Sequence, residues 1–158
     1  MVAAMPSPTP LATLLLGKGF RADDARGWTN VLAEVPLFSQ LGARQRRKVA
    51  SLARIRRFAD GAPIVRYGDP GDALHVVLDG AVSVLRPDRR PRTLGVGSVL
   101  GELALLDGGP RTATVAAKGE LVTLTIPAAR FRKLLRSEPT IAVAIAEELA
   151  RRLRAADS

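Results

Sequence analysis

Hydrophobic positions recur at helical spacing near both ends of this chain, and shorter runs lie between them. A helix is predicted from Asp23, a residue type that caps helices, with Val31 and Leu32 on its apolar face. The proline within residues 35–38 interrupts this pattern, and residues 43–54 predict a second helix. The N-terminal part should therefore form a small helical bundle.

Glycine punctuates the middle of the chain, where ten of the fourteen glycines lie between Gly61 and Gly119. They separate short β-branched runs, which is typical of antiparallel strands closed into a roll or barrel. Asp79-Gly80 is predicted to be a hairpin turn, because both central positions of such a turn need a positive φ. Residues 86–92, polar and with two prolines, are predicted to be a hairpin tip. The predicted strands are residues 64–66, 74–78, 81–85, 93–96, 113–116 and 121–126.

The C-terminal part predicts two helices. Pro127 suits the first position of a helix that runs to about Arg136. Pro139 starts the last helix, which runs to about Ala155. Its apolar stripe is predicted to consist of Ile141, Ile145, Leu149 and Leu153.

These patterns together predict an α+β fold, an antiparallel β-roll with an N-terminal helical bundle and two C-terminal helices. A mobile extension is expected over residues 1–22, which hold three prolines and no periodic pattern, and one domain over residues 23–158. Within the domain we expect helices over residues 23–55, the roll over 56–126 and the last helices over 127–156.

Composition excludes several classes of protein. No apolar run approaches the ~18 residues of a membrane-spanning helix, and no cysteine is present for disulfides, thiolate-bound metals or iron–sulfur clusters. A soluble, cytoplasmic protein is expected. His75 is the only histidine, cannot form a metal site alone and is interpreted as structural. Without cysteine, a serine–histidine pairing or an isolated carboxylate pair, the chain is not expected to be an enzyme.

The formal net charge of +9 raises the question of an anionic partner. The densest basic cluster lies in the N-terminal part: Arg44, Arg46, Arg47, Lys48, Arg54, Arg56 and Arg57. Such charge can attract nucleic acid or anionic lipid without specificity, but no interleaved aromatic residues support a stacking platform. We interpret the cluster as a solvated face.

Residues 100–115 read Leu-Gly-Glu-Leu-Ala-Leu-Leu-Asp-Gly-Gly-Pro-Arg-Thr-Ala-Thr-Val and carry most of the functional information. Gly101 permits close approach to a ligand, and residues 102–106 can form a helical turn whose first amides lack partners. Arg111 supplies a permanent charge with a fork that fits phosphate oxygens. Thr112 adds a hydroxyl, and the Thr112 and Ala113 amides add two more donors. The segment therefore predicts a site for a small phosphate.

Glu102 is an unexpected neighbour for a phosphate. A carboxylate is a pure acceptor, so it fits a ligand that also carries a hydroxyl, such as a ribose.

The same residues resemble the phosphate-binding cassette of cyclic nucleotide-binding domains, which occur in catabolite activator protein, protein kinase A regulatory subunits and bacterial cyclic-nucleotide-gated potassium channels. The cassette pattern is Phe-Gly-Glu-aliphatic-Ala-Leu, a spacer, then Pro-Arg-small-Ala-Thr or Ser. Leu100 replaces the usual Phe. The matching residues are Gly101, Glu102, Leu103, Ala104, Leu105, Pro110, Arg111, Thr112, Ala113 and Thr114.

The resemblance implies a jelly-roll topology and a role for each cassette residue. Arg111 would bind the exocyclic phosphate oxygens and Glu102 the ribose 2′-hydroxyl. The residues implied to line the cassette are Gly101, Leu103, Ala104, Thr112 and Ala113.

A purine also needs apolar walls and a cover. Val65, Val82, Val84 and Leu100 are candidates for the walls, and each could equally be ordinary core. In the family the final helix closes over the base and often supplies an arginine. Spacing from Pro139 favours Arg152 for this role, and an exposed i,i+4 pair with Glu148 is the alternative.

The resemblance implies a receptor for a cyclic nucleotide, cAMP with cGMP weaker, and no other cofactor. Haem and iron–sulfur sensors on the same scaffold need His or Cys ligands. Because the sequence stops at Ser158, we expect no helix-turn-helix DNA reader and a stand-alone receptor that signals to a protein partner through its last helix. The alternative is a ligand-independent interaction protein that uses the basic N-terminal helices. The partner, the oligomeric state and the base preference stay open.

Overall fold

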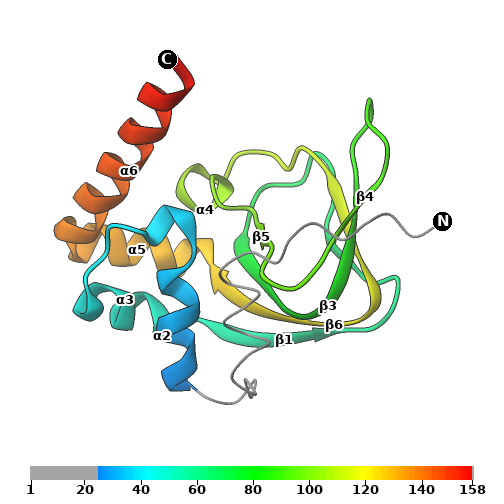
Figure 1. Ribbon diagram of the computed structural model, residues 1–158, viewed down its shortest axis with the longest axis horizontal. Coiled ribbons are helices and arrows are strands. Elements are labelled where there is room, and N and C mark those ends of the chain that lie inside the picture. The colour runs from blue at the N-terminus through cyan, green and yellow to red at the C-terminus, as the bar shows by residue number, and fades with distance from the viewer. Residues whose placement is uncertain (1–24, 158) are drawn as a thin grey trace.

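A computed structural model describes residues 25–157 (Figure 1). The predictions for residues 1–22 and for the Asp23 cap lie outside this range. Short helices come first, a rolled sheet follows, and two helices end the described chain. The helices are α2 (Ala25–Ala33), η1 (Pro36–Phe38), α3 (Ala43–Ala50), α4 (Ala104–Asp107), α5 (Ala128–Ser137) and α6 (Pro139–Asp157). The strands are β1 (Arg54–Phe58), β2 (Pro63–Val65), β3 (Ala73–Leu85), β4 (Arg92–Leu94), β5 (Val99–Leu100) and β6 (Thr114–Pro127).

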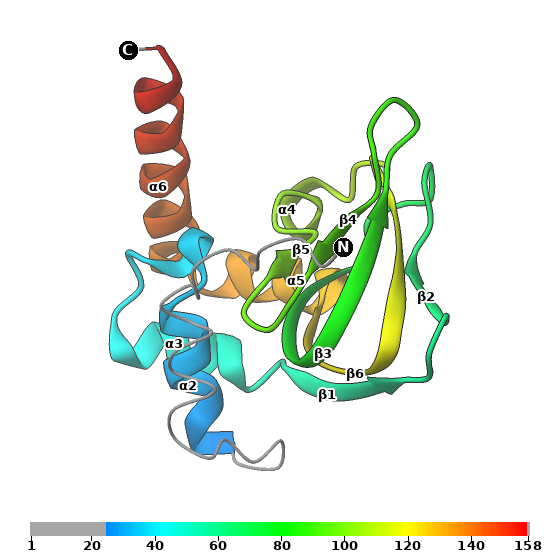
Figure 2. The same cartoon turned by 45° about the vertical axis from the view of Figure 1, so that its right-hand side comes forward.

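The sheet is antiparallel and is built on the pairing of β3 with β6, its two longest strands. Its order is β1-β6-β3-β4, with β2 also on β6 and β5 also on β3. Both long strands curl, which gives the roll seen in Figure 2. The predicted α+β roll with flanking helices is confirmed.

The predicted hairpin turn at Asp79-Gly80 is wrong, because β3 runs through it. The register with β6 shifts between Val77 and Ala81, and Gly80 has a φ of 87°. A Cβ at Gly80 would overlap the Glu120 carbonyl oxygen of β6. The glycine therefore serves a bulge that bends a continuous strand rather than a turn that ends it.

Other boundaries also differ from the prediction. β6 joins the two predicted strands 113–116 and 121–126 into one. The predicted helix over residues 43–54 ends at Ala50, and Arg54 begins β1. Pro127 is the residue before α5 and not its first residue. Among the described helices none is both long and apolar enough to cross a bilayer.

Two apolar clusters lie on opposite faces of the sheet. The first joins the helices to the sheet and includes Phe38 and Phe131, whose ring centroids are 5.7 Å apart. The second fills the interior of the roll. It contains all four predicted wall residues, Val65, Val82, Val84 and Leu100, which are buried.

Candidate functional site

The cassette begins where β5 leaves the sheet. Leu100 pairs with His75 of β3, and Gly101 then turns the chain with a φ of 77°. A Cβ at Gly101 would overlap the Arg111 guanidinium and would lie 2.7 Å from the Ala73 carbonyl oxygen. Gly101 is therefore required for two reasons: Arg111 approaches too closely for a side chain, and the backbone has a positive φ.

The helical turn predicted over residues 102–106 appears as α4, two residues later, and Gly108 ends it in the left-handed conformation. Leu103 precedes the turn and is exposed, whereas Ala104 is partly buried. A Cβ on Gly71 would overlap the Ala104 side chain, so the loop before β3 packs directly on α4.

That loop, residues 68–72, also fixes the backbone of Arg111. The Gly68 amide donates to the Arg111 carbonyl at 2.9 Å, and the Arg111 amide donates to the Asp69 carbonyl at 2.8 Å. The Gly71 amide donates to the Gly109 carbonyl at 3.0 Å. These three backbone hydrogen bonds hold residues 109–111 against the loop and so fix the position of the Arg111 backbone.

The Arg111 side chain is only 7% exposed, although it carries a full charge. Its Nη2 donates to the Ala73 carbonyl at 2.7 Å and lies 3.5 Å from the carboxylate of Asp72, which is 85% exposed. Its Nε is buried and has no partner in the described chain. A buried cation with one exposed counter-charge is electrostatically under-compensated, so the position favours an incoming anion.

A hollow of about 340 Å³ opens beside this guanidinium. Its lining contains charged groups of both signs, Arg66, Asp69, Asp72 and Arg111, next to an apolar side made of Pro63, Ile64, Val65 and Pro70. Val65 is the predicted wall residue that reaches both this hollow and the interior cluster.

After Arg111 the chain enters β6. Thr112 is exposed, whereas Ala113 is 8% exposed and joins the interior cluster. The Thr114 hydroxyl accepts a hydrogen bond from the Tyr67 amide at 3.0 Å. The structure brings Arg111 and Gly101 together and supports them with the loop of residues 68–72.

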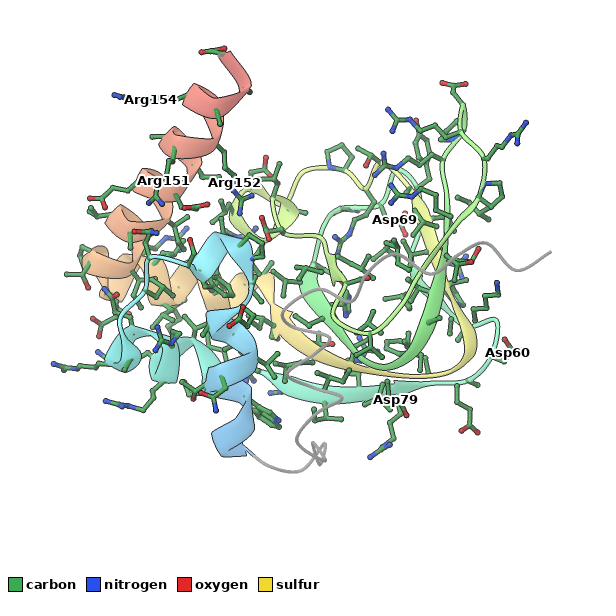
Figure 3. All side chains as sticks on the ribbon, viewed as in Figure 1. Asp60, Asp69, Asp79, Arg151, Arg152 and Arg154 are labelled. Carbon is green, nitrogen blue, oxygen red and sulfur yellow. The ribbon has the colours of Figure 1, made fainter. Side chains whose placement is uncertain are left out.

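Glu102 points to the last helix. Its Oε1 lies 2.5 Å from Nη1 of Arg152, and the same guanidinium donates through Nε to Glu148 at 3.3 Å. Figure 3 shows Arg152 on the side of α6 that faces α4, while Arg154 points away. The predicted i,i+4 pair with Glu148 is present, and the contact with Glu102, fifty residues away, was not predicted.

Burial lowers the pKa of Arg152, but the hydrogen bond and charge of Glu102, aided by Glu148, outweigh it and raise the pKa above its usual value. Ser39 was not predicted as part of this network, and Glu148 was expected only as the i,i+4 partner of Arg152. The Ser39 hydroxyl donates to Glu148 at 3.1 Å, and the hydroxyl lies just after η1.

His75 is buried, as a structural histidine should be. Its Nδ1 is 3.0 Å from the Thr125 hydroxyl, and its ring meets Phe58 edge-on. Burial, with a smaller contribution from Arg111, lowers its pKa from 6.5 to about 4. The described residues contain no group of three or more His, Cys, Asp or Glu able to hold a metal ion.

Comparison with known proteins agrees with this geometry. The family model described as cyclic nucleotide-binding domain matches residues 55–138. A cyclic nucleotide-gated potassium channel of Mesorhizobium japonicum is 40% identical over 133 residues, which cover 81% of this chain and 37% of the channel. The chain thus spans well under half of that relative.

Two solved structures are similar. The N-terminal domain of a transcriptional regulator from Streptomyces coelicolor A3(2) has a TM-score of 0.68 at 36% identity, over 80% of this chain and 92% of that one. The regulatory domain of Toxoplasma gondii PKA, solved with cAMP, has a TM-score of 0.62 at 28% identity, over 80% of this chain and 50% of that one.

Proposed function

The chain belongs to the cyclic nucleotide-binding domain family, and on this premise we propose that it is a cAMP receptor that binds cGMP more weakly and signals to a protein partner through α6. The observation that carries the proposal is Arg111. It is a buried guanidinium with an unpartnered Nε beside a hollow of about 340 Å³. A singly charged phosphate would supply the missing counter-charge.

The rest of the site supports a nucleoside phosphate over a bare anion. Glu102 offers an acceptor for a ribose hydroxyl. The proposed apolar wall for a base is Val65, Val82, Val84 and Leu100, of which Val65 lines the hollow. The absence of cysteine from the sequence supports a cytoplasmic location. We propose binding without turnover.

Isothermal titration calorimetry with cAMP, cGMP and 5′-AMP tests the proposal. We expect micromolar affinity for cAMP, which corresponds to about −8 kcal/mol, a weaker signal for cGMP and the weakest for 5′-AMP. Chromatography of the titrated nucleotide should recover it unchanged. No heat and no thermal shift at near-millimolar cAMP would refute the receptor and favour a ligand-independent interaction protein, with the exposed Arg54, Arg56 and Arg57 of β1 as the first surface to test.

A further inference from the structure

Within the described residues, Arg152 connects the last turns of α6 to the ligand site through an ion pair with Glu102. Ile141 and Ile145 bury the first half of the helix, but from residue 150 to residue 157 every residue except Arg152 is exposed. The Arg152 side chain is 34% exposed, and its partner Glu102 is 17% exposed. This ion pair therefore attaches the helix end to the cassette.

The geometry points to Arg152 as a positioning residue for Glu102, which would make recognition of the ribose 2′-hydroxyl depend on α6. The inference rests on the proposed function. Arg152 occupies Oε1 of Glu102, and a carboxylate has a second oxygen able to accept a hydrogen bond from a hydroxyl. Arg152 thus fixes the carboxylate without using up its acceptor capacity.

Arg152 also solves an electrostatic problem of the cassette. The Glu102 side chain is 17% exposed, and its negative charge would be repelled by a bound phosphate. The guanidinium at 2.5 Å offsets this repulsion. Without Arg152 the carboxylate would lose its orientation and its ion-pair partner.

A direct contact between Arg152 and the base is less well supported by the structure. Nη1 is bonded to Glu102 and Nε to Glu148, while Nη2 is buried without a partner in the described chain. Moving the guanidinium out of this position toward a base would break two charged hydrogen bonds. The guanidinium is packed between α6 and α4, so its effect on the ligand would pass through Glu102.

The pair also connects the ligand site to the N-terminal helices. Glu148 is 12% exposed, accepts hydrogen bonds from Arg152 and from the Ser39 hydroxyl, and forms an ion pair with Arg151 at 3.5 Å. A displacement of Glu102 is therefore transmitted to α6 and to the end of η1 by charged contacts.

Affinity for cAMP and for 2′-deoxy-cAMP, measured by calorimetry on the whole chain, tests this inference. The wild type should prefer cAMP by about tenfold, the effect of one charged hydrogen bond. In Arg152→Gln the preference should fall to about twofold or less, while Arg151→Gln, the adjacent control that bonds Glu148 alone, should keep it. Equal losses for both ligands in Arg152→Gln would indicate a base contact and overturn the inference. Tighter binding of cAMP would mean that Arg152 competes with the ribose, which also overturns it.

A second measurement needs no ligand. Hydrogen exchange over residues 146–157 should accelerate in Glu102→Gln and at least as much in Arg152→Gln, which also loses the Glu148 contact. The double variant should exchange no faster than Arg152→Gln, and Glu147→Gln, an exposed carboxylate on the same helix, should leave exchange unchanged. If the wild type binds neither nucleotide, the proposed function fails, but hydrogen exchange still tests the contact between Glu102 and Arg152. Unchanged exchange in Glu102→Gln would overturn the attachment of α6 through Glu102.

Discussion

Replacement of Arg111 by alanine should weaken cAMP binding more than removal of any other side chain of the cassette. The guanidinium is 7% exposed, so a phosphate bound to it is largely desolvated, and each charged hydrogen bond contributes about 1.5–3 kcal/mol. Binding would weaken the contact with Asp72, but that pair is long and its carboxylate is 85% exposed, so its loss costs about 0–1 kcal/mol. For one such hydrogen bond the net loss is about 0.5–3 kcal/mol, or roughly 2- to 150-fold in affinity.

Calorimetry at fixed salt on wild type, Arg111→Ala, Arg111→Lys and Glu102→Ala measures this loss. Arg111→Lys should fall between the first two, because it keeps the charge and loses the fork. Glu102→Ala should lose less than Arg111→Ala, since it removes a hydroxyl acceptor and not the phosphate cation. Arg130→Ala, an exposed arginine of α5, controls for net charge. Binding by Arg111→Ala within twofold of wild type would show that the phosphate lies elsewhere.

Three further predictions concern the residues around the ligand site and the last helix. Gly101→Ala should abolish binding and destabilise the fold, because its Cβ overlaps Arg111; Gly61→Ala, with a φ of 78° and open space around it, should show the backbone cost alone. Denaturant titrations should find the unfolding free energy about 2 kcal/mol lower at pH 5 than at pH 7. The reason is that His75, with a pKa of about 4 when folded and 6.5 when unfolded, takes up its proton on unfolding; the stability is present above pH 6.5 and is lost as pH falls toward 4. A His75→Gln variant with the same pH dependence would contradict this assignment. Finally, cAMP should slow hydrogen exchange over residues 139–155; equal exchange with and without ligand would direct the signal to the N-terminal helices instead.

The sequence alone predicts the β-roll and the Arg111 side of the site, because both depend on local signals. Short β-branched runs, punctuating glycines and the Gly-Glu and Pro-Arg pairs lie close together in the chain. The error at Asp79-Gly80 has a physical cause. A glycine with positive φ serves a turn and a bulge equally well, and only the pairing of β3 with β6 selects the bulge.

Two other features depend on three-dimensional geometry. A spacing of four residues advances about 40° beyond a full turn of the helix, so Leu153 lies roughly 120° around α6 from Ile141. Leu153 is accordingly 68% exposed, and its predicted place on the buried stripe is wrong. Arg152 is the residue of that region that turns inward. Its partner Glu102 lies on a different element, and no periodicity within α6 could have identified it.

The two parts of the site differ in how they are held, and the proposed receptor function depends on this difference. Arg111 is fixed by backbone hydrogen bonds to the loop 68–72 and by the close approach of Gly101, so phosphate binding there requires little ordering. Glu102 is oriented by a side chain on the exposed end of α6, which few apolar contacts retain. A ligand that needs both residues therefore favours the states in which α6 is docked. Its phosphate would provide most of the affinity by binding Arg111. Its ribose hydroxyl, by binding Glu102, would shift the population of α6 toward the docked state.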